Sequence, residues 1–259
     1  MITATLLLNL ALLVGCNKPQ TELPVDTAPS NSTTEFATLP SSEPTSVETD
    51  EDVEYEGDAT SYYIDVVYAQ QIERYYTAIS QQWDENAYLE HEMSPLAAHY
   101  YEGKPLDNVG FTFMDLDGDG IGELIIGAIK KAENDPLIFE IWALKNDEPV
   151  MLAQSGSHNR YYLQYAEEDD LWSVAYEAEN SAANRAIYYL QLFEGKFKVI
   201  QGVIFDAVVN ENAPWFMAYD LDWNVSNDMP IDEDTANSVM NAERRTYAAL
   251  EYLPYSLYK

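Results

Sequence analysis

The sequence predicts an α+β protein, in which an antiparallel β-meander has one helix before it and one after it, both packed on the sheet. Three observations support this class. Helix-periodic apolar positions occur in residues 61–83, short apolar segments follow one another from residue 109 to 219, and a second helical pattern covers residues 233–251. The short connections between the apolar segments favour antiparallel neighbours over crossover helices. We find no repeat of about 20–50 residues, which argues against a propeller or a solenoid.

The N-terminal segment is typical of export. Residues 2–14 are almost wholly apolar and too short to span a bilayer, and they end in Leu13-Val14-Gly15-Cys16. This ending resembles the lipobox of bacterial lipoproteins, although no Lys or Arg precedes the apolar run. The resemblance implies a signal peptide over residues 1–15 and acylation of Cys16, the one cysteine of the chain. We therefore expect a lipid anchor in the cell membrane, on its extracytoplasmic face.

Residues 16–60 have the composition of a disordered tether. Ser, Thr, Pro, Asp and Glu make up 29 of the 44 residues 17–60, and this stretch holds 11 acids and one base. Such a segment buries too little apolar surface to offset its ordering entropy. We expect a disordered acidic linker here.

Residues 61–259 are predicted to form a single domain, because about 200 residues suffice for one hydrophobic core. This part carries 34 acids and 12 bases, and the whole chain has a formal net charge of −32. Such a charge argues against nucleic acid and anionic lipid head groups as partners. It is compatible with cations or basic surfaces.

The elements follow from periodicity and turn chemistry. In the first helix, apolar residues recur at spacings of four and three from Ile64 to Trp83, and a weaker helical stretch over 86–101 is broken near Pro95. The final helix has acids in its first turn and two arginines in its second half, as the helix dipole prefers. The predicted strands are 109–114, 123–129, 137–144, 149–154, 160–166, 171–178, 185–193, 196–205 and 214–219.

The most informative motif is FMDLDGDGIGELIIG at residues 113–127. Asp115, Asp117 and Asp119 occupy alternate positions, and glycines follow the second and third of them. Three carboxylates this close repel one another unless a cation lies among them, and a hard divalent ion prefers several oxygen ligands on a tight turn. The alternative is an acidic turn whose Asp side chains cap backbone amides. The flanking apolar runs indicate strands on both sides.

The loop matches an EF-hand loop incompletely, since the twelfth position, where that motif needs a bidentate Glu, is Ile126. It resembles more closely the strand–loop–strand calcium motif of FG-GAP and integrin-type repeats, in one copy. That resemblance implies a Ca²⁺ site in which the acid at position nine is a ligand. The family normally has Asp there, and this chain has Glu123. The implied ligands are the side chains of Asp115, Asp117, Asp119 and Glu123 and the backbone carbonyl of Ile121.

The order of segments also resembles that of surface lipoproteins of Firmicutes. Along the chain follow, in this order, the lipobox, the acidic linker, a Tyr-rich helix, one acidic hairpin, the β-meander and the final helix. The resemblance implies a location at the cell surface and calcium binding, and it implies no reaction.

A few weaker features leave alternatives open. Asp220, Asp222, Asn224 and Asp228 repeat the spacing of the first loop without its glycine, and could form a second calcium site or a polar turn. Adjacent tyrosines on strands are expected to place one ring in the core and one outside, where exposed rings could bind a sugar or a protein.

The sequence favours a non-enzymatic binding or interaction module that contacts a cell-wall component, a glycan or another protein. No catalytic residues are assigned. The alternatives are a cell-wall or glycan hydrolase that uses a carboxylate pair, and a solute-binding lipoprotein, which usually needs two lobes around a cleft.

Overall fold

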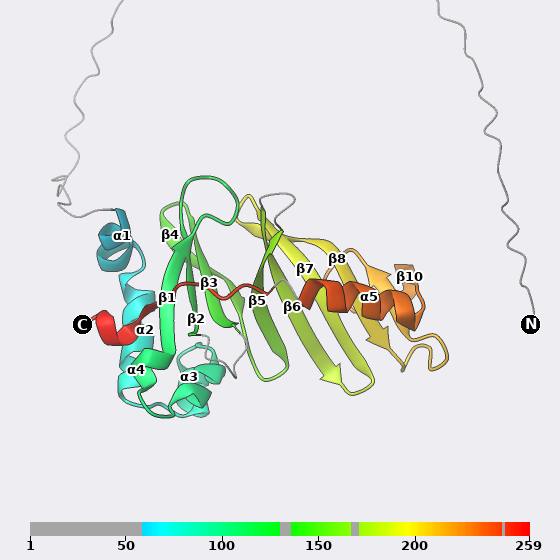
Figure 1. Ribbon diagram of the computed structural model, residues 1–259, viewed down its shortest axis with the longest axis horizontal. Coiled ribbons are helices and arrows are strands. Elements are labelled where there is room, and N and C mark those ends of the chain that lie inside the picture. Colours follow the sequence, from blue (N-terminus) through cyan, green and yellow to red (C-terminus); the bar gives the residue numbers. More distant parts are fainter. Residues whose placement is uncertain (1–58, 130–135, 167–170, 245–246) are drawn as a thin grey trace, which may run out of the picture. The chain divides into compact units, whose positions relative to one another are not determined.

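The computed structural model describes residues 59–129, 136–166, 171–244 and 247–259 (Figure 1). All described residues belong to one compact unit. The predicted signal peptide over 1–15, Cys16 and nearly all of the predicted linker over 16–60 lie outside the described residues. The first helix, α1 (Ala59–Tyr62), begins within the last two residues of that predicted linker.

Short helices precede the sheet, and the predicted first helix is interrupted once. A π-helical turn, η1 (Tyr63–Val67), ends at Tyr68, whose N–H donates to the carbonyl of Tyr63 at 2.9 Å. This turn brings the rings of Tyr63 and Tyr68 to 6.1 Å, and both stack on Phe113. Aromatic packing against the sheet therefore accompanies the break. The following elements are α2 (Ala69–Ser80), α3 (Glu85–Glu90), the 3₁₀ helix η2 (Pro95–Tyr100) and α4 (Pro105–Asn108).

The described strands form one antiparallel sheet of 11 strands, accompanied by a few helices, which confirms the predicted antiparallel sheet. Its order is β10-β9-β8-β7-β6-β5-β3-β2-β1-β11, and β4 also pairs with β3. The sheet departs from a simple meander because β4 and β5 both pair with β3, at different ends of that strand. The strands are β1 (Val109–Met114), β2 (Glu123–Ala128), β3 (Leu137–Lys145), β4 (Glu148–Gln154), β5 (Asn159–Ala166), β6 (Leu171–Ser181), β7 (Asn184–Phe193), β8 (Lys196–Asp206), β9 (Trp215–Ala218), β10 (Met229–Pro230) and β11 (Leu253–Pro254).

The last helix, α5 (Glu233–Arg244), is shorter than the predicted 233–251. After it the chain runs along β5, where Ala248 donates its N–H to the carbonyl of Leu163 at 2.8 Å. The ring of Tyr247 stacks on that of Tyr162 at 4.5 Å. These long-range contacts favour extended chain over helical propensity, and β11 then pairs with β1. A short 3₁₀ helix, η4 (Tyr255–Leu257), follows.

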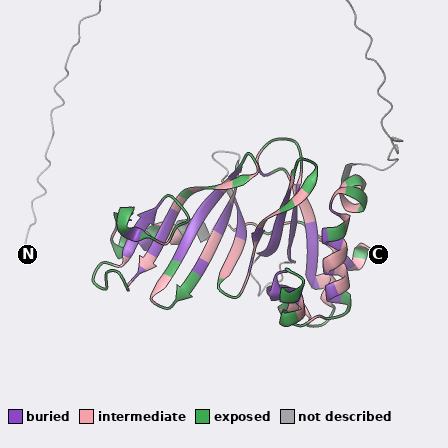
Figure 2. Cartoon of the chain, turned by 180° about the vertical axis from the view of Figure 1, so that it is seen from behind, coloured by how far each residue is buried: buried purple, intermediate pink, exposed green. Residues whose placement is uncertain are grey.

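Each face of the sheet carries a cluster of buried residues, and Figure 2 shows buried segments along most of the strands. One cluster joins residues of α2 and β1–β3 and includes Ile72, Phe111 and Phe139. The second lies on the opposite side of the strands and includes Ile125, Ile141 and Ile204.

The expectation that adjacent tyrosines on strands split between core and solvent is wrong at residues 188 and 189. Tyr188 is 0% exposed and Tyr189 is 4% exposed, and they belong to different clusters. Leu116 of the acidic loop and Val225 of the 3₁₀ helix η3 (Val225–Asn227) belong to the second cluster and contribute to its burial.

Candidate metal centre

The acidic loop connects β1 to β2, and Met114 pairs with Glu123 where the hairpin closes. Gly118 and Gly120 have φ values of +79° and +86°, in the left-handed region that favours glycine. The loop is held by its own carboxylates. Asp115 Oδ1 accepts the N–H of Gly118 at 2.7 Å, and Asp115 Oδ2 accepts the N–H of Gly120 at 3.0 Å. Acids and glycines alternate here because each tight bend needs a carboxylate that accepts a backbone N–H and a glycine that adopts a positive φ.

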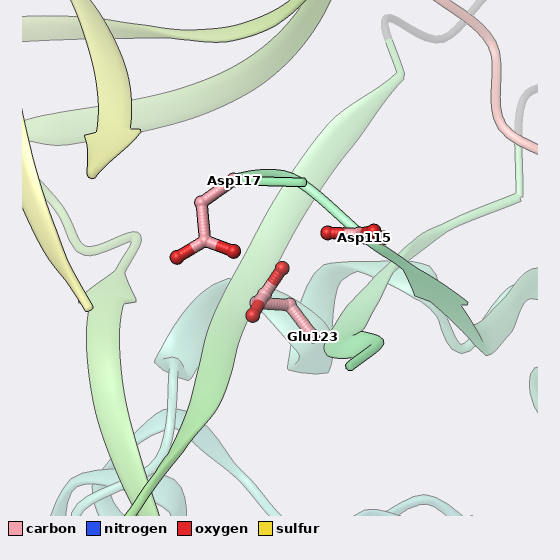
Figure 3. A group of neighbouring side chains, drawn as sticks. All are labelled: Asp115, Asp117 and Glu123. Carbon is pink, nitrogen blue, oxygen red and sulfur yellow. The ribbon is translucent and has the colours of Figure 1, made fainter. Parts of the chain in front are cut away.

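Three carboxylates meet inside this loop. One oxygen each from Asp115, Asp117 and Glu123 lie within 4.8 Å of one another. Figure 3 shows the three carboxyl groups around one small space, with Glu123 rising from β2 toward the loop. Glu123 is 3% exposed, Asp117 is partly exposed and Asp115 is exposed. This group could hold a metal ion, with one ligand at the protein interior and two toward solvent.

Burial and the neighbouring charges act together on Glu123. Removal from water raises the pKa of its carboxyl from 4.5 to about 7, and repulsion by Asp117, Asp119 and Asp115 adds to the rise. One hydrogen bond opposes it, since Glu123 Oε2 accepts the N–H of Leu116 at 2.8 Å. The ionised form of this site is therefore costly without a cation, and a cation would relieve that cost.

The loop is anchored to both faces of the sheet. Leu116, which lies between two of the acids, is 6% exposed and belongs to the second buried cluster. On the other side, Tyr68 Oη donates to the carbonyl of Gly122 at 3.2 Å, and Tyr63 Oη accepts the N–H of Gly122 at 3.4 Å. These contacts leave little signal in the sequence, where Leu116 and Ile121 are the apolar residues of an otherwise polar loop.

The predicted ligand set is reproduced in part. Asp115, Asp117 and Glu123 come together, whereas Asp119 lies outside this group, and its Oδ1 accepts the N–H of Ile121 at 2.7 Å. The carbonyl of Ile121 stays a predicted ligand. The Asp side chains also cap backbone amides, so the two readings of the loop are compatible: a carboxylate oxygen has two lone pairs and can accept an N–H and bind an ion.

The second acidic loop repeats the turn geometry without the cluster. Asp220 Oδ1 accepts the N–H of Asp222 at 3.2 Å, and Asp222 Oδ1 accepts the N–H of Asn224 at 2.7 Å. Asp228 carries a buried Oδ2 that has no hydrogen-bond partner. Across the described ranges, however, the group around Glu123 is the one place where three potential ligand side chains converge.

Comparisons with protein-family models, with curated proteins and with solved structures found no match. Among the described residues, no helix has the length and apolar character needed to cross a membrane. The expectations of a signal peptide, of acylation at Cys16 and of a surface location therefore stay predictions from the sequence.

Proposed function

We propose that this chain is a lipid-anchored extracytoplasmic protein whose domain binds one Ca²⁺ in the loop over residues 115–123. The domain serves as a binding module at the cell surface, with a cell-wall component, a glycan or another protein as its ligand. Cys16 carries the lipid, and residues 17–60 act as the tether. This location rests on the sequence of the N-terminal segment.

One observation carries the calcium site: a nearly buried carboxylate, Glu123, faces two further carboxylates and has no basic partner in the contacts described for it. Unpaired buried charge is rare in proteins unless it coordinates a metal or takes up a proton. The available donors are all oxygens, which suits a hard cation and argues against zinc.

Calcium fits this loop better than magnesium does. Ca²⁺ accepts six to eight oxygen ligands in flexible geometry, whereas Mg²⁺ needs near-ideal octahedral order and keeps several waters. Three carboxylates can supply several oxygens, and Asp119, the Ile121 carbonyl and water at the exposed side would complete the shell. Because this loop lacks the bidentate Glu of an EF-hand, we expect a dissociation constant of about 0.1–1 mM, the range of extracellular modules.

The role of the ion is structural in this proposal. Calcium would fix the β1–β2 hairpin and hold Leu116 against the second buried cluster. We also infer that the N-terminal and C-terminal helices cover the same face of the sheet, because residues of α2 and Ala236 of α5 belong to one buried cluster.

The test is a thermal melt of the purified chain in EDTA, in a calcium series and in magnesium. At a calcium concentration of 100 times the dissociation constant, binding adds about 2.7 kcal/mol to the free energy of unfolding. For a domain of this size that raises the melting temperature by roughly 5–10 °C. Asp117→Asn should abolish most of the rise. Asp147→Asn, in an exposed hairpin turn, is the matched control and should keep it.

Equal melting of the wild type with and without calcium would overturn the calcium site. The anchor is tested separately with Cys16→Ser, expressed in a host that processes lipoproteins. We expect the wild type in the membrane fraction and the variant in the soluble fraction. Equal distribution of the two would reject the lipid anchor and leave the calcium site untouched.

A further inference from the structure

A cavity of about 390 Å³ lies between the sheet and α5. Its walls come from β5–β9 on one side and from Asn237 and Met240 of α5 on the other. Small-molecule sites in proteins usually enclose ~300–1,000 Å³, so the cavity has the size of a site for a small ligand. None of its lining residues belongs to the acidic loop.

Four charged side chains of alternating sign surround one side of this cavity. Arg160 of β5 lies directly opposite Glu177 of β6, and Glu179 of β6 lies directly opposite Arg185 of β7. Glu177 is also the cross-strand partner of Ile187, so all four share the sheet face that carries Ile187. Positively and negatively charged side chains are therefore neighbours at this place, on a domain that is otherwise strongly acidic.

Glu177 is engaged by residues outside this group: Tyr247 Oη donates to Glu177 Oε1 at 2.7 Å. Within the described part of the chain, neither Arg160 nor Arg185 forms an ion pair with a carboxylate. Arg160 donates instead to the carbonyls of Gly156 and Asn159. The guanidinium of Arg185 lies 5.1 Å from the ring centre of Phe205 and 5.7 Å from that of Trp215. Stacking on aromatic rings holds this guanidinium in place and leaves its edge donors available.

The inner wall of the cavity is apolar. Ile187, Val203 and Trp215 are at most 6% exposed and line it from the sheet, and Met240 lines it from α5. Asn237 adds one amide that can donate and accept hydrogen bonds. Eight of the 14 lining residues are polar or charged, so this apolar wall forms one side of a mostly polar cavity.

We propose that this cavity binds a zwitterionic amino acid or short peptide that carries an apolar side chain. Arg185, assisted by Arg160, receives the carboxylate, and Glu179 receives the ammonium group. The apolar side chain enters between Met240 and the sheet. A purely anionic ligand would be repelled by Glu179 and by the net charge of the domain. A purely cationic one would meet two arginines.

Isothermal titration of the purified full chain with the dipeptide leucyl-leucine tests this site. We expect a dissociation constant of about 1 mM or tighter. N-acetyl-leucine, which lacks the ammonium group, and leucinamide, which lacks the carboxylate, should each bind about tenfold more weakly than free leucine, because each leaves one charged partner without its hydrogen bonds. Inorganic phosphate should not compete.

Variants locate the binding. Arg185→Ala should weaken leucyl-leucine at least about tenfold, and Arg185→Lys should weaken it less, since a charge remains without the planar guanidinium. Lys198→Ala is the matched control, because Lys198 is also a cation over an aromatic ring, that of Phe193, and does not line the cavity. The affinity of Lys198→Ala for leucyl-leucine should equal that of the wild type. Arg185 is exposed, so its replacement should leave the fold intact, and the rise in melting temperature on adding calcium should stay the same.

Three results would overturn the proposal. The first is no heat of binding from the wild type with leucyl-leucine or leucine. The second is equal affinity of Arg185→Ala and Lys198→Ala. The third is N-acetyl-leucine binding as tightly as leucine, which would mean that the cavity does not recognise the ammonium group.

Discussion

Replacement of Glu123 by Gln should make the metal-free protein more stable at high pH. The carboxyl pKa is raised from 4.5 to about 7 in the folded chain, so the folded state binds more protons than the unfolded state between these values. The free energy of unfolding therefore falls as pH rises through this window, and stays low above it. At about 1.4 kcal/mol per pH unit, the ionised carboxylate costs ~3 kcal/mol.

Gln removes this cost without removing the contacts. Its carbonyl oxygen can accept the N–H of Leu116 that Glu123 Oε2 accepts at 2.8 Å. Its amide group can donate to Asp115 or Asp117, whose carboxylates lie next to it. In EDTA, Glu123→Gln should match the wild type below the unfolded-state pKa, at about pH 4, and exceed it by up to ~3 kcal/mol near pH 8. In saturating calcium the order should reverse, because the variant lacks a charged ligand.

The assay is urea denaturation followed by tryptophan fluorescence, at several pH values, in EDTA and in calcium. Glu148→Gln is the control, because Glu148 is also the first residue of a strand and is exposed. Its free energy of unfolding should follow the wild type at every pH. If Glu123→Gln shows no gain over the wild type in EDTA at high pH, the carboxylate is not desolvated as described here. If the variant keeps the full calcium response, Glu123 is not a ligand.

Three further predictions concern the fold, and chemical denaturation measures each. Glu140 is 1% exposed and accepts the N–H groups of Ser94, Trp142 and Gln154. Glu140→Gln leaves one of these donors facing an amide group and should lower the free energy of unfolding by about 1–3 kcal/mol. An unchanged denaturation midpoint would contradict this. Gly127→Ala places a Cβ 2.4 Å from Tyr252 Oη and 2.8 Å from the carbonyl of Leu137, and should lower the free energy of unfolding by about 1–3 kcal/mol. Gly103→Ala is the comparison: no atom lies within 4 Å of its Cβ, so it reports only the strain of its positive φ. Asp84 accepts the N–H of Ala87 at 2.9 Å as the N-cap of α3, so Asp84→Ala should cost about 1 kcal/mol and Asp84→Asn much less.

The strands were predictable because their turns carry a local signal. Asn146 and Asp147 have φ values of 53° and 63° between β3 and β4, and Glu194 and Gly195 have 51° and 66° between β7 and β8. Residues that tolerate the left-handed region mark such hairpins in the sequence. The apolar segments between them then fall into register, and the predicted strand limits agree with the structure within a few residues.

The connections that depend on distant partners were not predictable. The chain after α5 has helical periodicity, but it is extended because it lies along β5. β11 lies beside Gly110, where an added Cβ would meet the carbonyl of Leu253 at 2.6 Å. The cavity charges of β5–β7 have no signal in the sequence either. Arg160 and Glu177 lie on consecutive strands, and the strand register places them directly opposite each other.

The candidate metal site was predictable as a motif, and its energetics were not. The spacing of the acids identifies the loop, whereas the burial of Glu123 depends on its position as the first residue of β2 and on Leu116 above it. The same loop reaches the other face through Gly122, which hydrogen-bonds to Tyr63 and Tyr68. An ion at Glu123 would thus act on both buried clusters at once. Calcium should therefore raise the stability of the whole domain, and amide hydrogen exchange should slow in β2 and around Tyr68 together. Slowing confined to residues 115–122 would refute this coupling.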